Sequence, residues 1–281
     1  MGYRVIVLLA SLALPVIARA AEPAVVVSEA ITDRDGIRVH QVTCPYQAGS
    51  TRIRVLLPDP LDSSRKYPVI YVLPVEALDE NHYGDGLLEI EHHDLQNRAG
   101  AIFVSPTFSA LPWYADHPTD SLIRQETYFL KVVLPFVEKA YPARAEAQGR
   151  LLLGFSKSGW GAMSLLLRHP DLFGKAAAWD APLMLDKPDR YGTEPIFGTQ
   201  KQFEEYQVTR LLEKQAAQFR SGDRIFLLGY GNFRVQMQQA HDYMARLKIS
   251  HIYVDGPKRS HDWNSGWVPE AVRMLLSHAE H

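Results

Sequence analysis

The sequence is poor in cysteine, with Cys44 as the only one among 281 residues. A single cysteine cannot form an intrachain disulfide. We therefore expect Cys44 to pack as a small apolar side chain in a strand. The stability of the chain should come from a hydrophobic core, which a chain of this length can bury.

An excess of charge is also lacking. The formal net charge is -2 and the isoelectric point is about 6.6. Proteins that bind nucleic acids or anionic membrane surfaces usually carry a basic excess or a basic patch. The composition therefore gives no indication of a nucleic-acid partner.

Long apolar runs are missing after the first twenty residues. Those twenty combine Arg4, an apolar run over residues 5–18 and the small-x-small sequence Ala18-Arg19-Ala20, which together are typical of a cleaved signal peptide. The alternative, a membrane anchor, is disfavoured because the run is short and Pro15 interrupts it. We predict signal peptide 1–20 and one domain over 21–281, secreted or periplasmic and without membrane contact after cleavage.

The rest of the chain alternates between strand-like and helical patterns. Strands are expected over residues 37–45, 51–57, 66–75, 101–106, 151–153, 175–182, 223–231 and 250–256. Helices are expected over residues 85–100, 121–141 (bent or divided by Pro135), 159–169, 235–249 and 269–281, with polar loop and helix over 183–221. This alternation predicts an α/β fold whose mostly parallel central sheet has helices on both faces, with an antiparallel strand pair at its N-terminal edge.

The most informative stretch is residues 150–163, RLLLGFSKSGWGAM. An apolar strand, a turn of small residues and a helix follow one another, with Ser156 at the turn. This is the context of a nucleophile elbow, in which a strained corner exposes the serine hydroxyl and the helix N-terminus faces the developing negative charge. The usual form is G-x-S-x-G, and here Ser158 stands at the last position.

An activated serine needs a general base, and His261 is the best-placed candidate. It lies in the polar loop 256–267, directly after the last predicted strand, where a base can reach back over the strand ends. The other histidines that follow Ser156 lie in predicted helices, at the start of a strand or at the tail.

Two residues compete for the role of orienting that histidine. Asp180 ends the predicted strand 175–182, whereas Asn232 follows the strand 223–231, the usual place for the acid. An asparagine can accept a hydrogen bond from the histidine but cannot stabilise the imidazolium by charge. Asp255 and Asp262, which flank the histidine loop, are further possibilities.

Two backbone N–H groups should stabilise the oxyanion. The first is predicted on Lys157, directly after the nucleophile, and the second on Val75 or Glu76, after the strand 66–75. The aromatic residues Trp113, Tyr114 and Trp160 are candidates for substrate binding. Histidine and acidic residues cluster at 82 and 92–94, but no metal-binding spacing such as HExxH or CxxC occurs. We therefore expect neither metal nor cofactor.

These motifs together resemble one family. GFSKSGWGA is similar to the elbow of the esterase D-like branch of the α/β-hydrolases, G-x-S-x-G-G-x-G-A. TRIRVLLP with KYPVIYVLP resembles its N-terminal strands, YFLKVVLPFVEKAYPA its helix before the elbow, and SHDWNSGW its histidine loop. The resemblance spans residues 50–275 and implies an α/β-hydrolase fold.

The resemblance also implies carboxylic ester chemistry. Members of the family act on formylglutathione, feruloyl, acetyl-sugar and siderophore esters, and mycobacterial relatives transfer acyl groups to sugars. In the family the acid stands at the position of Asn232. The sequence thus predicts an exported serine esterase for small-molecule or carbohydrate esters. The alternatives are a serine peptidase or acyltransferase on the same fold, or a binding protein that has lost the acid.

Overall fold

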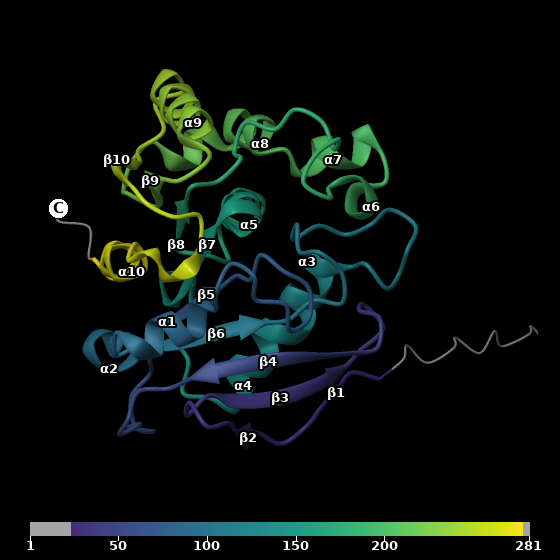
Figure 1. The fold of residues 1–281 in the computed structure, drawn as a ribbon, viewed down its shortest axis with the longest axis vertical. Coiled ribbons are helices and arrows are strands. Elements are labelled where there is room, and N and C mark those ends of the chain that lie inside the picture. Colours follow the sequence, from purple (N-terminus) through teal and green to yellow (C-terminus); the bar gives the residue numbers. More distant parts are fainter. Residues whose placement is uncertain (1–23, 278–281) are drawn as a thin grey trace, which may run out of the picture.

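The computed structural model describes residues 24–277, so the predicted signal peptide 1–20 lies outside the described residues. One ten-stranded sheet runs through this part of the chain (Figure 1). Its strands are β1 (Val26–Val27), β2 (Ile31–Thr32), β3 (Arg38–Thr43), β4 (Ser50–Leu56), β5 (Val69–Val72), β6 (Ile102–Pro106), β7 (Arg150–Phe155), β8 (Lys175–Trp179), β9 (Ile225–Tyr230) and β10 (Ile252–Lys258).

The N-terminal part of the sheet is antiparallel, as the sequence predicts. β3 pairs with β4, and β4 pairs with β6, both antiparallel. In β4 the buried and partly exposed residues alternate along most of the strand, since one face packs on the core and the other meets solvent. The short strands β1 and β2 extend this edge by pairing with β3.

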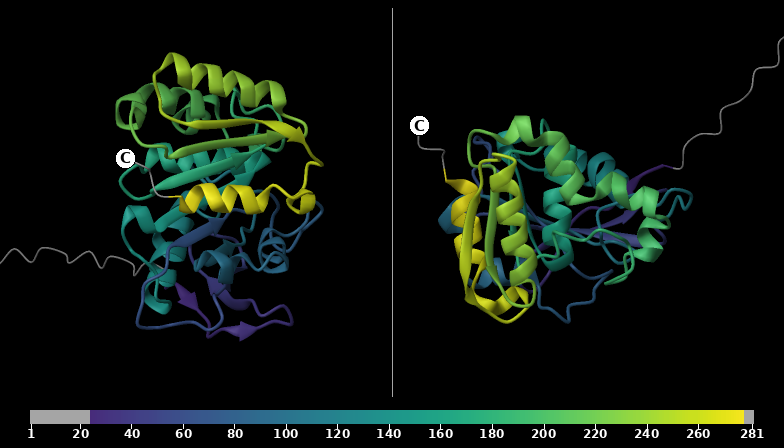
Figure 2. Two further views of the ribbon diagram at one scale, coloured as in Figure 1. Left: turned by 90° about the vertical axis from the view of Figure 1, so that its left-hand side faces the viewer. Right: turned by 90° about the horizontal axis from the view of Figure 1, so that it is seen from above.

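The remaining strands are parallel and lie in the order β6-β5-β7-β8-β9-β10. Figure 2 shows the succession from the purple N-terminal strands at one end to green and yellow β9 and β10 at the other. Every residue of β5 is buried, and so are nearly all of β7, β8 and β9, which explains their continuous apolar runs. Because the strands are parallel, the residues that follow β7, β8 and β9 meet at one edge of the sheet.

Helices cover both faces and confirm the predicted α/β fold. They are α1 (Gly86–His92), α2 (Leu95–Ala99), α3 (Gln125–Tyr128), α4 (Leu134–Ala140), α5 (Ser156–Arg168), α6 (Glu194–Phe197), α7 (Gln200–Tyr206), α8 (Val208–Gln215), α9 (Arg234–Arg246) and α10 (Val268–Leu276). Buried residues of α1, α2 and α10 form one apolar cluster on the sheet, and those of α4 to α9 join the cluster on the other face. Within residues 24–277 no helix is both long and apolar enough to cross a membrane.

Two predicted helices are divided. The segment 121–141 contains α3, a π-helical turn over Phe129–Val133, and α4. Pro135 stands in the first turn of α4 and has no N–H to continue the α-helical pattern, so the division at this proline is confirmed. The segment 85–100 was expected to be one helix, but it breaks into α1 and α2 because Asp94 adopts a left-handed conformation with φ of 52°.

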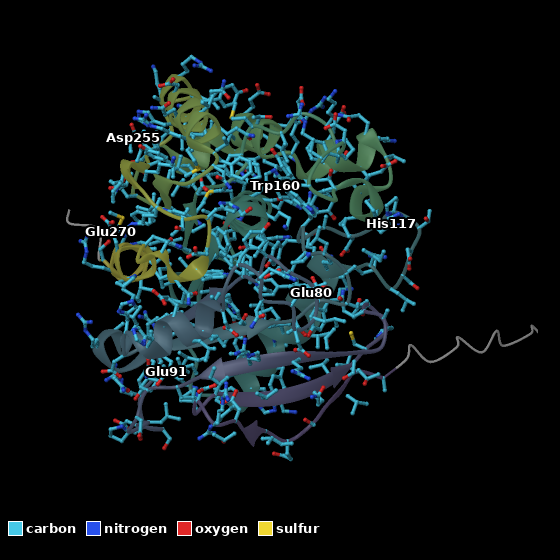
Figure 3. The ribbon with its side chains drawn as sticks, viewed as in Figure 1. Glu80, Glu91, His117, Trp160, Asp255 and Glu270 are labelled. Carbon is cyan, nitrogen blue, oxygen red and sulfur yellow. The ribbon has the colours of Figure 1, made fainter. Side chains whose placement is uncertain are left out.

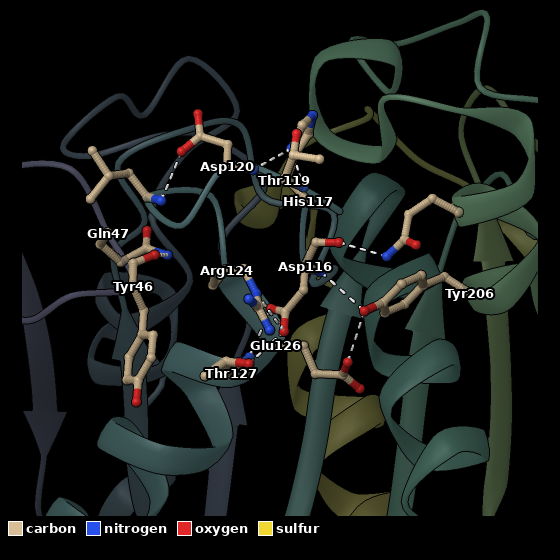
Figure 4. A network of polar contacts seen from close by, with 12 residues as sticks. Tyr46, Gln47, Asp116, His117, Thr119, Asp120, Arg124, Glu126, Thr127 and Tyr206 are labelled. Carbon is tan, nitrogen blue, oxygen red and sulfur yellow. Dashed lines mark hydrogen bonds and ion pairs between the residues drawn. The ribbon is translucent and has the colours of Figure 1, made fainter. Parts of the chain in front are cut away.

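A buried polar network anchors the segment between β6 and α3 to the rest of the molecule (Figure 4). The Glu126 carboxylate accepts hydrogen bonds from Arg168 at 2.9 and 3.2 Å, from His169 at 2.6 Å and from the Tyr206 hydroxyl at 3.0 Å. The Tyr206 hydroxyl in turn accepts the N–H of Asp116 at 3.1 Å. The network therefore ties the C-terminal end of α5 to α3 and α7.

Candidate active site

The strand β7 ends at Phe155, and α5 begins at Ser156, which is the predicted nucleophile. Ser156 has a φ of 51°, in the region that residues with a side chain rarely adopt. Gly154 makes the corner possible, because a Cβ at this position would lie 2.3 Å from the carbonyl oxygen of Ser158. The chain therefore forms the tight strand-to-helix corner of a nucleophile elbow.

Ser158, the departure from the usual elbow sequence, has a structural partner. Its side chain is fully buried. The Ser158 hydroxyl accepts the N–H of Phe155 at 3.1 Å and donates to the carbonyl oxygen of Phe155 at 2.9 Å. A hydroxyl at this position thus satisfies both backbone groups of the residue that precedes Ser156.

His261 pairs with Asp180 at the carboxyl end of β8. The distance from His261 Nδ1 to Asp180 Oδ2 is 2.5 Å. The Asp180 side chain is completely buried, whereas the His261 side chain is 14% exposed. The structure thus brings together His261 and Asp180, one of the two residues that the sequence offers first for orienting the histidine.

The backbone after β9 also holds the Asp180 carboxylate. The N–H of Asn232 donates to Oδ2 at 2.7 Å, and the N–H of Phe233 donates to Oδ1 at 2.6 Å. Burial alone would raise the pKa of Asp180, but hydrogen bonds from His261 and from backbone N–H groups, including that of Gly231, hold it below its ordinary value. Asp180 is therefore ionised at neutral pH.

Asn232 does not contact His261 through its side chain. The residue is exposed, and among the described residues its hydrogen bond at the site is the one that its backbone N–H donates to Asp180. Of the two further candidates, Asp255 pairs with Arg234 at 2.7 Å, and the Asp262 carboxylate makes no hydrogen bond to His261 among residues 24–277. The geometry favours Asp180 over the other three as the partner of His261.

The His261 ring lies beside the elbow. Its centroid is 5.1 Å from that of Phe155, the residue before Ser156, and 6.2 Å from that of Trp179, the last residue of β8. In the described part of the chain, Ser156 and His261 make no direct hydrogen bond. This contact is often long in enzymes without bound substrate and tightens when the substrate binds.

The predicted oxyanion donors flank this corner. The N–H of Lys157 belongs to the first turn of α5, where helix N–H groups have no intrahelical partner. Val75 and Glu76 follow β5, which pairs directly with β7. Among the described residues, the N–H groups of all three donate to no protein acceptor. They therefore remain candidates for binding the oxyanion.

The prediction that three aromatic residues bind the substrate needs correction. Trp113, Tyr114 and Trp160 are fully buried, and Trp160, labelled in Figure 3, belongs to α5 itself. The Trp113 and Trp160 rings pack against each other with centroids 5.4 Å apart, and the Tyr114 hydroxyl donates to the carbonyl oxygen of Pro74 at 2.6 Å. These residues support the elbow helix from within the core and present no surface to a substrate.

The aromatic residues that do surround His261 were missed. Tyr83 and Phe233 lie with ring centroids 5.7 and 5.6 Å from that of His261, and Tyr191 packs on Phe233 at 5.5 Å. Tyr83 and Tyr191 are about two-fifths exposed. The position of Phe233, directly after Asn232 in the loop that follows β9, was the one available signal in the sequence.

One cavity of about 640 Å³ reaches His261 and is also lined by Asn232, Lys258 and Arg259.

A possible group of metal ligands lies in the loop after β5. The described residues contain one cluster with three ligand atoms within 4.8 Å of one another, on Glu76, Glu80 and His82. The Glu76 carboxylate in this cluster already accepts protein hydrogen bonds from the backbone and side chain of His82. We therefore interpret the cluster as a loop closure.

Comparison with known proteins gives a family match. A family model described as "Putative esterase" matches residues 47–247. Two proteins of Mycobacterium tuberculosis, Esterase MT1326 of strain CDC 1551 / Oshkosh and Esterase Rv1288 of strain H37Rv, are each 31% identical over 137 residues. The matched region covers 47% of this chain and 29% of each relative, so the chain spans less than a third of their length.

Solved structures share the fold. An S-formylglutathione hydrolase from Agrobacterium tumefaciens superimposes with a TM-score of 0.69 at 14% identity, covering 89% of this chain and 98% of that one. A ferulic acid esterase superimposes with a TM-score of 0.65 at 21% identity, covering 90% and 96%. At these identities the likeness establishes the α/β-hydrolase fold, as the sequence predicts.

Proposed function

Because this chain belongs to the esterase family described as "Putative esterase", we propose that it is an exported serine hydrolase that cleaves carboxylic esters of small molecules or carbohydrates. The observation that carries the proposal is the buried Asp180–His261 pair beside the strained elbow of Ser156. A base with an ionised partner next to a serine hydroxyl at a strained corner is the arrangement that activates a serine.

The reaction follows from these positions. His261 takes the proton of the Ser156 hydroxyl as its oxygen attacks the ester carbonyl carbon. The Asp180 carboxylate accepts the Nδ1–H of His261, which fixes the tautomer and stabilises the imidazolium. His261 then gives the proton to the leaving alcohol, and water cleaves the acyl-enzyme by the same steps in reverse order.

The negative charge of the tetrahedral intermediate needs donors. We assign the N–H of Lys157 and the N–H of Val75 or Glu76 to this role, because they lie beside the elbow without a protein acceptor in the described residues. The N-terminus of α5 adds a favourable dipole. Removing one such donor typically slows acyl transfer roughly 10²- to 10³-fold.

The same contacts bear on the alternative functions. The lack of an aspartate after β9 favours a non-catalytic binding protein, but Asp180, directly after β8, supplies a carboxylate to His261. A binding protein also has no use for the strain at Ser156. Acyl transfer to an alcohol uses the same residues, so it differs from hydrolysis only in the final acceptor.

The proposal is tested with the mature chain, residues 21–281. We expect turnover of p-nitrophenyl acetate and butyrate, and covalent labelling by a fluorophosphonate probe. Ser156→Ala should lose the labelling and nearly all turnover, because the attacking oxygen is gone. If the wild-type chain neither turns over these esters nor reacts with the probe, the enzyme hypothesis is wrong.

Export is a separate part of the proposal and rests on the sequence of residues 1–20. We expect the protein to leave the cytoplasm and to begin at Ala21. N-terminal sequencing of the protein from a periplasmic or culture fraction tests this. An uncleaved chain in the cytoplasmic fraction would contradict it.

A further inference from the structure

The Glu76 carboxylate closes a loop at the active site. Glu76 follows β5 and its side chain is only 8% exposed. Its Oε1 accepts the backbone N–H of His82 at 3.1 Å and the His82 ring Nδ1 at 2.7 Å, while Oε2 accepts the N–H of Tyr83 at 3.2 Å. The segment 76–83 is thereby held as a closed turn around one acidic side chain.

This turn is in contact with the catalytic histidine. The Tyr83 ring lies 5.7 Å from that of His261 and 6.3 Å from that of Phe155. The carbonyl oxygen of Tyr83 accepts the N–H of Trp263, two residues after His261, at 2.8 Å. A shift of the turn would therefore move both the histidine loop and the edge of the elbow.

The side chain of Lys157, the residue after the nucleophile, lies over the Tyr83 ring of the same turn. The Lys157 ammonium lies 5.8 Å from the centroid of the Tyr83 ring. The backbone N–H of Tyr83 donates to the Glu76 carboxylate. Burial lowers the pKa of Lys157, and the negative charge of Glu76 partly opposes that change. Two opposite charges thus sit on the two residues whose N–H groups flank the elbow.

We propose that Glu76 is a positioning residue of this esterase. Its carboxylate, bonded to the N–H groups of His82 and Tyr83 and attracted to the Lys157 ammonium that lies over the Tyr83 ring, holds the loop after β5 beside the start of α5 and so fixes the spacing of the oxyanion donors. The inference rests on the proposed function and assigns a role to the Glu76 side chain, whereas the proposed function uses only backbone groups at this position.

A carboxylate fits this place better than an amide of the same size. Oε1 of Glu76 accepts the N–H of His82, and Oε2 accepts the N–H of Tyr83. An amide would turn one NH₂ group toward an N–H donor and would lose the attraction to Lys157. Because misplacing a catalytic group by about 1 Å can cost roughly 10²-fold in rate, a small widening of the gap should be measurable.

The test compares Glu76→Gln with Glu91→Gln, the same change at an exposed residue of α1 outside the loop. We expect Glu76→Gln to lower kcat roughly 10- to 100-fold on p-nitrophenyl butyrate with little change in KM, since the loss is confined to the transition state. Affinity for a trifluoromethyl ketone, which forms an oxyanion adduct with the serine, should fall by a similar factor. Glu91→Gln should match the wild type in both measurements.

Lys157→Met tests the attraction between the two side chains in a second way, because it removes the ammonium charge and leaves the hydrogen bonds of Glu76 in place. It should also lower kcat and analogue affinity, and the double variant should lose less than the product of the two single losses, because the two side chains act through one interaction. Unchanged kcat in Glu76→Gln, or multiplicative losses in the double variant, would overturn the inference while wild-type turnover still supports the esterase.

Discussion

At the level of single residues, the proposed mechanism depends on the acid behind His261. Asp180 lies 2.5 Å from His261 and is held by two backbone N–H groups at 2.6 and 2.7 Å. These contacts keep its carboxylate ionised, and an ionised partner both orients the imidazole and stabilises its protonated form. The exposed amide of Asn232 offers neither effect.

Two substitutions separate these residues. Asp180→Asn should lower kcat/KM roughly 10³- to 10⁴-fold, because an amide supports the wrong tautomer of His261 and provides no charge. Asn232→Ala should leave it within about twofold of the wild type, because the backbone N–H that holds Asp180 remains. Steady-state kinetics on p-nitrophenyl butyrate checks both. The reverse ranking would return the acid to position 232.

The sequence allowed part of this site to be predicted. Ser156 and His261 stand out because a strand-turn-helix motif and a polar loop after the last strand are local patterns. The sequence left Asp180 as one of four candidates, since its contact with His261 crosses 81 positions of the chain. Tyr83 was missed because its place depends on a loop closure, and buried Trp113 was misassigned because an aromatic residue after a strand can serve either the core or a ligand.

At the level of elements, the elbow joins β7 to α5 through an unusual serine. The Ser158 hydroxyl satisfies both the N–H and the carbonyl group of Phe155 in a place without solvent. Buried backbone groups that lose their partners cost free energy, typically about 1–3 kcal/mol for each group. The hydroxyl is thus part of what keeps the strained corner folded.

Ser158→Ala should therefore lower the free energy of unfolding by about 1–3 kcal/mol. Urea denaturation gives this value from the shift in the transition midpoint. Ser63→Ala, which removes a hydroxyl from an exposed loop residue, is the matched control and should be neutral. Equal midpoints for Ser158→Ala and the wild type would contradict the role assigned to the hydroxyl.

Most elements were predictable, and their interruptions were only partly so. The buried strands follow from continuous apolar runs, and the division at Pro135 follows from the missing N–H of proline. The break between α1 and α2 could not be predicted, because aspartate adopts the left-handed conformation seen at Asp94 only occasionally and no local sequence pattern marks it here. Over 183–221 the polar composition predicts loop and helix but does not give the bounds of α6, α7 and α8.

At the level of the whole molecule, the Glu126 network connects the elbow helix to the segments outside the sheet. Burial alone would raise the pKa of Glu126, but hydrogen bonds from His169 and Arg168 outweigh it and lower the pKa from 4.5 to about 2. The folded state thus binds a proton at Glu126 less readily than the unfolded chain does. The stability from this group is present above pH 4.5 and is lost as the pH falls toward 2.

The comparison of wild type with Glu126→Gln measures this effect. The wild type should have the larger free energy of unfolding at pH 7. This difference should shrink as the pH falls from about 5 to 2, because protonation then neutralises the Glu126 carboxylate, whereas the glutamine of the variant is neutral at every pH. Urea midpoints at several pH values check it. An advantage that stays constant over this range would show that the charge of Glu126 does not stabilise the fold.

The way Asp180 is held has a consequence for reading genomes. Its donors after β9 are main-chain N–H groups, which every amino acid except proline supplies, so a change of side chain at position 232 leaves these hydrogen bonds in place. If the proposed mechanism holds, a survey that labels relatives as pseudoenzymes for lacking aspartate in that loop would discard chains built like this one. The position to inspect would be the residue directly after the strand next to that of the nucleophile.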